Sequence, residues 1–284
     1  GRLPKIIYAN TSAEYWVLQG ALIHTDLATG GDTESPENER IYHFAGVQHV
    51  GGFPLPLRDT TAYPENARAL YLYNSLNYQP LVRAALVNLA AWVRDGRTPP
   101  ASKHPKTADG TAVPREVALQ RLELIPGVRR PEPLTPVESF DYGQETTPWQ
   151  ATKFPPDSLG GYPDLVPAVD SDGNDLGGIR LPDVEAPLAT YTGWNARHGD
   201  IGGEGQPLVL AGATIPFPVT AASRQAMGDP RPSIEERYES KEAFLGKIRK
   251  AAVDLVRQGY MLEEDIELVA LASAARYDEF TSRG

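Results

Sequence analysis

The chain has 284 residues, of which 41% are hydrophobic, and it contains no cysteine. This length suits one large domain or two small ones, and the lack of cysteine excludes disulfides, thiolate zinc sites and cysteine nucleophiles. The formal net charge of −10 argues against nucleic acid and anionic membrane as partners, because both require a basic binding surface.

Two short apolar segments near the start are each followed by a side chain that can handle protons. The segment 5–9 is rich in β-branched and aromatic residues and precedes Glu14, and the segment 41–45 precedes His49. Side chains just past the carboxyl ends of neighbouring parallel strands converge on one crevice, so this carboxylate and imidazole are expected to meet. The pattern predicts His49 as a general base and Glu14 as the acid that orients it.

Other interpretations of these positions stay open. Asp26 and Asp32 also precede His49 and are alternative acids. Glu14 could instead complement the positive end of a helix dipole, and His49 could be a buried residue that only bonds to the backbone. His43 falls inside the second apolar segment, which favours packing over reactivity.

A helix is predicted after His49. Pro80 suits a first helical turn, Gly96 suits the position just past a helix end, and apolar residues between them recur at helical spacing. The alternation of strand and helix over 1–96 is typical of the end of a doubly wound parallel sheet.

The sequence changes in character over 97–232, where short apolar runs are interrupted by proline and glycine. These two residue types make up about 18% of the chain, against about 12% on average. Short strands are predicted at 165–169, 178–181 and 208–211, with a hairpin turn at Asp172–Gly173. We expect this region to wrap the core, with Trp149 and Trp194 either anchoring it by burial or lining a cleft.

Two patterns in the same region resemble ligand sites but are interpreted otherwise. The segment 170–175 begins like a calcium loop, yet Gly173 holds the fourth position, and Leu181 holds the twelfth, where a bidentate glutamate belongs. The glycine-rich segment 199–205 contains no lysine and borders no clear strand or helix, which argues against a phosphate cradle. No metal or other cofactor is predicted.

The chain becomes helical from residue 233 onward. Ser233 and Glu236 have the spacing of a capping box, and two longer helices are predicted at 241–258 and 262–280. Their apolar stripes indicate packing. No apolar run approaches the roughly 20 residues that span a bilayer, and the cellular compartment is left open because cytosolic and exported proteins can both lack cysteine.

Several stretches together resemble a bacterial family described as α/β-hydrolase domain proteins of undefined substrate. They lie at 8–16, 22–26, 42–49, 166–174, 177–184, 190–195 and 228–238. The resemblance implies an α/β fold in which the acid follows the penultimate core strand and the histidine follows the last one. It also implies three parts: the end of the hydrolase core (1–96), the Pro/Gly-rich wrap (97–232) and carboxyl-terminal helices (233–284).

The nucleophile of that family is missing from this chain. An α/β-hydrolase carries its serine in a Gly-x-Ser-x-Gly turn, and no serine here has glycine two positions before it. Because the family order is serine, acid, histidine, we interpret the chain as the carboxyl-terminal portion of such a hydrolase, with the nucleophile and most of the oxyanion hole on an upstream segment.

The resemblance implies a carboxylic ester hydrolase acting on a small-molecule ester, with this chain inactive by itself. The alternative hypothesis is a non-catalytic binding or interaction module that keeps the hydrolase remnant as a scaffold. A truncated sheet would in either case expose a strand edge, which predicts self-association unless another segment covers that edge.

Overall fold

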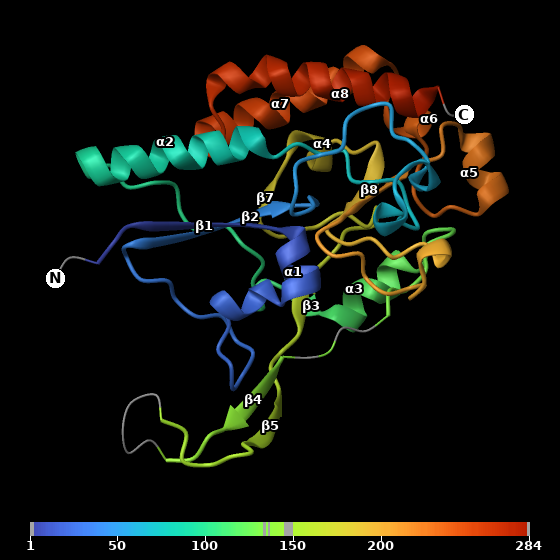
Figure 1. Ribbon diagram of the computed structural model, residues 1–284. Coiled ribbons are helices and arrows are strands. Elements are labelled where there is room, and N and C mark those ends of the chain that lie inside the picture. Colours follow the sequence, from blue (N-terminus) through green and yellow to red (C-terminus); the bar gives the residue numbers. More distant parts are fainter. Residues whose placement is uncertain (1–2, 133–134, 136, 145–149, 283–284) are drawn as a thin grey trace.

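Two paired parallel strands, β1 (Ile6–Thr11) and β2 (Glu39–Ala45), form the frame of the molecule. The structure is a computed structural model that describes residues 3–132, 135, 137–144 and 150–282. A short third strand, β7 (Ile179–Arg180), pairs in parallel with the end of β2, so the sheet order is β1-β2-β7. Helices and strands alternate around this sheet, which is an α/β arrangement (Figure 1).

The two faces of this sheet are covered by different helices. Figure 1 shows α2 (Gln79–Asp95), α7 (Lys241–Gln258) and α8 (Ile266–Thr281) together on one side, and α1 (Ser12–Leu18) on the other. The principal apolar cluster joins strand β2 to these helices through fully buried side chains. Its members include Phe44, Ile179, Val184, Phe244, Ile248 and Phe280.

The remaining elements are short. Three antiparallel strand pairs are present in the described residues. They are β3 (Ala112–Pro114) with β6 (Leu165–Pro167), β4 (Glu138–Asp141) with β5 (Asp157–Gly161), and β8 (Ala189–Thr192) with β9 (Ala213–Pro216). The other helices are α3 (Arg115–Leu122), α4 (Pro182–Glu185), α5 (Ala221–Met227) and α6 (Ile234–Arg237), with 3-10 turns at Gly20–Ile23, Thr60–Ala62, Glu65–Ala67, Gly199–Ile201 and Glu263–Asp265.

The ends of several helices follow the signals in the sequence. Pro80 lies in the first turn of α2, and Gly96 ends the helix with a left-handed φ of 69°, as predicted. Ser233 and Glu236 form the predicted capping box at the start of α6. In each case the signal is local, because the side chain or the glycine satisfies backbone groups of its own helix.

One predicted strand is wrong. The segment 208–211 is a turn, in which Leu210 has φ +65° and the Ala211 amide bonds to the carbonyl of Leu208. A left-handed residue cannot continue a strand, so the strand starts two residues later, at Ala213. The strands predicted at 165–169 and 178–181 are present in shorter form as β6 and β7.

The region 97–232 does not lie entirely against the sheet. Figure 1 shows the β4–β5 hairpin extending away from the body of the molecule. Trp194 is buried against Trp16, with their ring centroids 5.9 Å apart, whereas Trp149 lies outside the described residues. The division into parts at residues 96 and 232 stays a prediction.

Strand β1 lies at an edge of the sheet. Among the described residues it pairs only with β2, and Tyr8 and Ala9 in its middle are exposed. The exposed strand edge predicted from the sequence is therefore present. No helix in the described part of the chain is long and apolar enough to cross a bilayer.

Candidate functional site

Glu14 is held where β1 passes into α1. Thr11 is the N-cap of α1, and its backbone amide donates a hydrogen bond of 2.6 Å to Glu14 Oε2, to which its hydroxyl also donates. This capping box needs a threonine and a glutamate three residues apart. The same short contacts fix the direction in which the carboxylate points.

His49 is held just past the end of β2. Gly46, with φ +72°, turns the chain out of the strand, and a Cβ there would lie 3.1 Å from Val184. The buried Gln48 accepts a 2.9 Å hydrogen bond from the Gly212 amide, and the Tyr78 hydroxyl donates to the carbonyl of His49. The imidazole therefore projects from a loop that is fixed from three directions.

The structure brings these two side chains into contact. His49 Nδ1 hydrogen-bonds to Glu14 Oε1, and the side chains are 46% and 16% exposed, respectively. A carboxylate can only accept, so Nδ1 carries a proton, and in the neutral form of the ring Nε2 presents its lone pair. The arrangement can take up a proton at Nε2 while the carboxylate stabilises the imidazolium that forms.

The position of Glu14 is compatible both with a role at the start of a helix and with a role as the partner of His49. Oxygen Oε2 serves the helix cap and Oε1 faces the imidazole. Because a carboxylate has two oxygens with two lone pairs each, neither contact excludes the other.

The rival acids lie elsewhere. Asp26 accepts hydrogen bonds from Ala28 and Thr29 within its own exposed turn, and these bonds lower the pKa of its carboxyl group. Asp32 accepts the amides of Thr107 and Ala108, each at 2.9 Å. Neither aspartate is a partner of His49, so both serve to fix loops.

His43 is fully buried in β2, as predicted. Its Nε2 lies 3.3 Å from Asp175 Oδ2, and its ring packs at an edge-on angle against Tyr15 with centroids 4.6 Å apart. His43 thus belongs to a polar cluster inside the molecule, not to the surface site.

Ser12 belongs to the same buried cluster. Its hydroxyl donates to Asp175 and accepts a 2.7 Å hydrogen bond from the Gly46 amide, and the residue is 0% exposed. These contacts join the end of β1 to the end of β2 beneath the Glu14–His49 pair. Although Ser12 is close in sequence to Glu14, burial leaves its hydroxyl inaccessible to a substrate.

We expect Ser12→Ala to destabilise the fold by about 1–2 kcal/mol, because it removes a buried hydroxyl with two partners. Urea denaturation followed by circular dichroism measures this loss. Ser158→Ala is the control, since Ser158 is exposed and its hydrogen bonds to described residues stay within its hairpin, with Glu138 and the amide of Gly160. Equal unfolding free energies for the two variants would contradict the structural role of Ser12.

The segment that begins like a calcium loop is a tight turn. Asp170 Oδ1 accepts the amides of Asp172 and Asn174, each at 2.9 Å, and Val169 and Asp175 form an antiparallel bridge across the turn. The predicted hairpin turn is therefore correct. Within the described residues, no group of three or more histidines or carboxylates is arranged to hold a metal ion.

Sequence reasoning missed two residues that position the site. Asp175 accepts a hydrogen bond from the Gly46 amide, although the two residues are 129 positions apart in the sequence. Tyr78, at the start of α2, donates its hydroxyl hydrogen bond to the carbonyl of His49. Burial, and after it the charge of Glu14, raises the pKa of Tyr78, which keeps its hydroxyl a donor. No local signal marks either residue, because each acts across the fold.

Comparison with known proteins identifies a family for this chain. A search of curated proteins and a search of solved structures found no match. The model of the family described as alpha/beta hydrolase domain matches residues 4–270, which includes β1, β2, Glu14 and His49. The chain therefore belongs to the alpha/beta hydrolase domain family.

Proposed function

We propose that His49 and Glu14 are the base and the orienting acid of a serine hydrolase that acts on carboxylic esters. One observation carries this proposal: the imidazole bonds to the carboxylate through Nδ1 and is 46% exposed, at the carboxyl ends of two parallel strands. An imidazole that serves only the fold has no need of an open Nε2, whereas a base does.

The chemistry follows from that geometry. His49 Nε2 takes the proton of a serine hydroxyl as the oxygen attacks the ester carbonyl, and it returns the proton to the departing alcohol. It then takes a proton from water as the water oxygen attacks the acyl-serine ester, and it gives this proton to the serine oxygen as the acid is released. Glu14 holds the imidazole in the required tautomer and stabilises its charged form in both steps.

The serine itself is proposed to come from a segment outside these 284 residues. No Gly-x-Ser-x-Gly sequence is present, and no serine hydroxyl in the described part of the chain bonds to His49. The open edge of β1 offers a place for a further parallel strand, so a segment carrying the nucleophilic turn would lie beside Glu14 and His49. Such a segment would also supply most of the oxyanion hole.

A fluorophosphonate probe and an activated ester such as 4-nitrophenyl acetate test the proposal. We expect neither labelling nor turnover with the 284-residue chain, and both when the chain is expressed with the coding sequence that precedes it. His49→Ala should abolish both in the longer form. His43→Gln is the matched control, because His43 is buried and bonds to Asp175.

Two outcomes would contradict the proposal. Turnover by the 284-residue chain that disappears in His49→Ala would show that the nucleophile is present after all. A folded longer form that neither reacts with the probe nor hydrolyses esters would favour the alternative, a binding module on a hydrolase scaffold, for which the absent nucleophilic turn is the supporting observation.

A further inference from the structure

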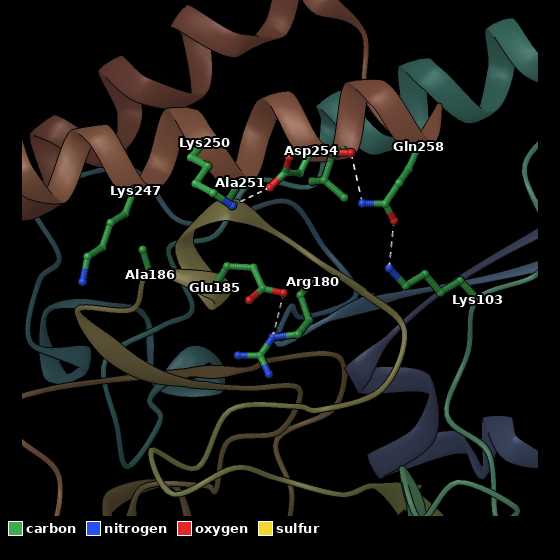
Figure 2. Close-up of a pocket in the computed structure, with 10 residues that line it drawn as sticks. Lys103, Arg180, Glu185, Ala186, Lys247, Lys250, Ala251, Asp254 and Gln258 are labelled. Carbon is green, nitrogen blue, oxygen red and sulfur yellow. Dashed lines mark hydrogen bonds and ion pairs between the residues drawn. The ribbon is translucent and has the colours of Figure 1, made fainter.

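A cavity of about 380 Å³ lies between α7 and the segment formed by β7 and α4, and neither Glu14 nor His49 lines it (Figure 2). Its volume is within the range of small-molecule sites. The cations that line it are Lys103, Arg180, Lys247 and Lys250, against two carboxylates, Glu185 and Asp254. A chain with 37 acidic and 27 basic residues thus concentrates positive charge at this place.

The cavity is elongated along α7. The residues that α7 contributes recur at helical spacing from Lys247 through Ala251 and Leu255 to Gln258. Eleven residues separate the two ends, which corresponds to a rise of about 16 Å along the helix axis. Figure 2 shows Lys247 and Lys103 at opposite ends of this row.

The two cations in the middle are already neutralised. Arg180 lies 3.1 Å from Asp170 and 3.4 Å from Glu185. Lys250 lies 2.9 Å from Asp254. Coulombic attraction is therefore satisfied at the centre without any ligand.

The two cations at the ends lack a carboxylate partner among the described residues. Lys103 donates a 3.3 Å hydrogen bond to the neutral Gln258 Oε1, and its ammonium lies 5.4 Å from the centre of the Tyr260 ring. Lys247 lies 5.1 Å from the centre of the Tyr238 ring. Each aromatic ring stabilises an ammonium group in place without neutralising it.

Burial lowers the pKa of Lys103, and the charge of Glu185 opposes this shift without cancelling it. A half-buried ammonium group without a direct ion-pair partner loses hydration that an anion would replace. The wall between the two ends includes three apolar residues, Ala186, Ala251 and Leu255. The middle of the cavity is thus charge-balanced and partly apolar, and both ends are cationic.

We propose that this cavity binds a linear organic dianion, with a carboxylate or phosphate group at each end and a hydrocarbon middle. Lys103 binds one anionic end and Lys247 binds the other. The middle of the ligand lies against Ala251 and Leu255 of α7. This assignment does not depend on the hydrolytic role of His49.

Isothermal titration calorimetry with decanedioate, decanoate, succinate and inorganic phosphate tests the proposal. Decanedioate should bind at least about tenfold more tightly than each of the other three, because it alone joins two carboxylates by a hydrocarbon chain long enough to run along the row of α7 residues. Lys103→Met and Lys247→Met should each weaken decanedioate binding about tenfold, and the double variant should bind it no better than wild type binds decanoate.

Lys241→Met is the matched control, because Lys241 is on the same helix but pairs with Asp278 outside the cavity. It should leave the dissociation constant within about twofold of wild type. Lys247→Arg keeps the charge and should retain binding. Equal affinity for succinate or phosphate, the absence of decanedioate binding, or equal losses in Lys247→Met and Lys241→Met would each overturn the proposal.

Discussion

Glu14→Gln is expected to lower ester hydrolysis by about four orders of magnitude while changing the stability of the fold by less than about 1 kcal/mol. Activity and stability respond differently because the two carboxylate oxygens bond to different groups, Oε2 to Thr11 and Oε1 to His49. Glutamine can still accept the hydrogen bonds of Thr11 in the capping box. It cannot reproduce the contact with His49.

The loss of activity has a specific cause. An amide facing His49 Nδ1 donates a hydrogen bond where the carboxylate oxygen accepts one, which favours the tautomer with its proton on Nε2. That tautomer cannot take a proton from a serine hydroxyl, and no negative charge remains to stabilise an imidazolium. The ¹⁵N chemical shifts of the His49 ring in the 284-residue chain report the tautomer directly, and kcat of the longer form reports the consequence.

Thr11→Ala is the complementary variant. It removes the hydroxyl of the helix cap but keeps the carboxylate beside His49, so it should cost about 1 kcal/mol of stability and less than about tenfold in kcat. If Glu14→Gln leaves both the tautomer and the rate unchanged, or if Thr11→Ala is the more damaging variant for hydrolysis, the proposed role of the carboxylate is wrong.

The meeting of Glu14 and His49 could be predicted from the sequence because each step of the inference is local. A β-branched run predicts a strand, and the residue just past its carboxyl end faces the edge shared by parallel neighbours. Gly96 and the pair Ser233 and Glu236 mark helix ends for the same reason. A few adjacent residues determine each helix end, and the site adds only the parallel pairing of the two consecutive strands β1 and β2.

The support beneath the site could not be predicted. Asp175 bonds to Ser12, His43 and the Gly46 amide across 129 to 163 residues, and β7 reaches β2 from a similar distance along the chain. Such contacts depend on the packed fold and leave no periodic pattern. The strand predicted at 208–211 failed because Leu210 adopts a left-handed backbone conformation, which an apolar run does not reveal.

We expect protonation of one buried histidine, His24, to lower the stability of the folded chain by about 2 kcal/mol between pH 6.5 and pH 4.5. Its side chain is 1% exposed, and burial is the main cause that lowers its pKa to about 3. The adjacent ring of His104, with centroids 4.0 Å apart, adds to the shift.

The direction of this effect follows from proton binding. In the unfolded chain His24 has a pKa of about 6.5, so between that value and about 3 the unfolded state binds a proton that the folded state does not. Stability is therefore full above pH 6.5 and falls as the pH falls through this window, by up to about 5 kcal/mol in total. Inside the fold, Nε2 bonds to the Tyr15 hydroxyl at 2.8 Å, while Nδ1 is buried without a hydrogen-bond partner, so a proton there has no acceptor.

Urea denaturation at a series of pH values measures the effect, with His24→Gln as the test variant. Glutamine still offers an acceptor to the Tyr15 hydroxyl but does not titrate, so the loss of stability between pH 6.5 and pH 4.5 should shrink by about 2 kcal/mol. Carboxylates with lowered pKa values, such as Asp32, lose their contribution to stability in a more acidic range than His24 does. The effect of the histidine can therefore be distinguished from that of the carboxylates. A wild-type slope in His24→Gln would show that the buried imidazole is not the acid-sensitive group.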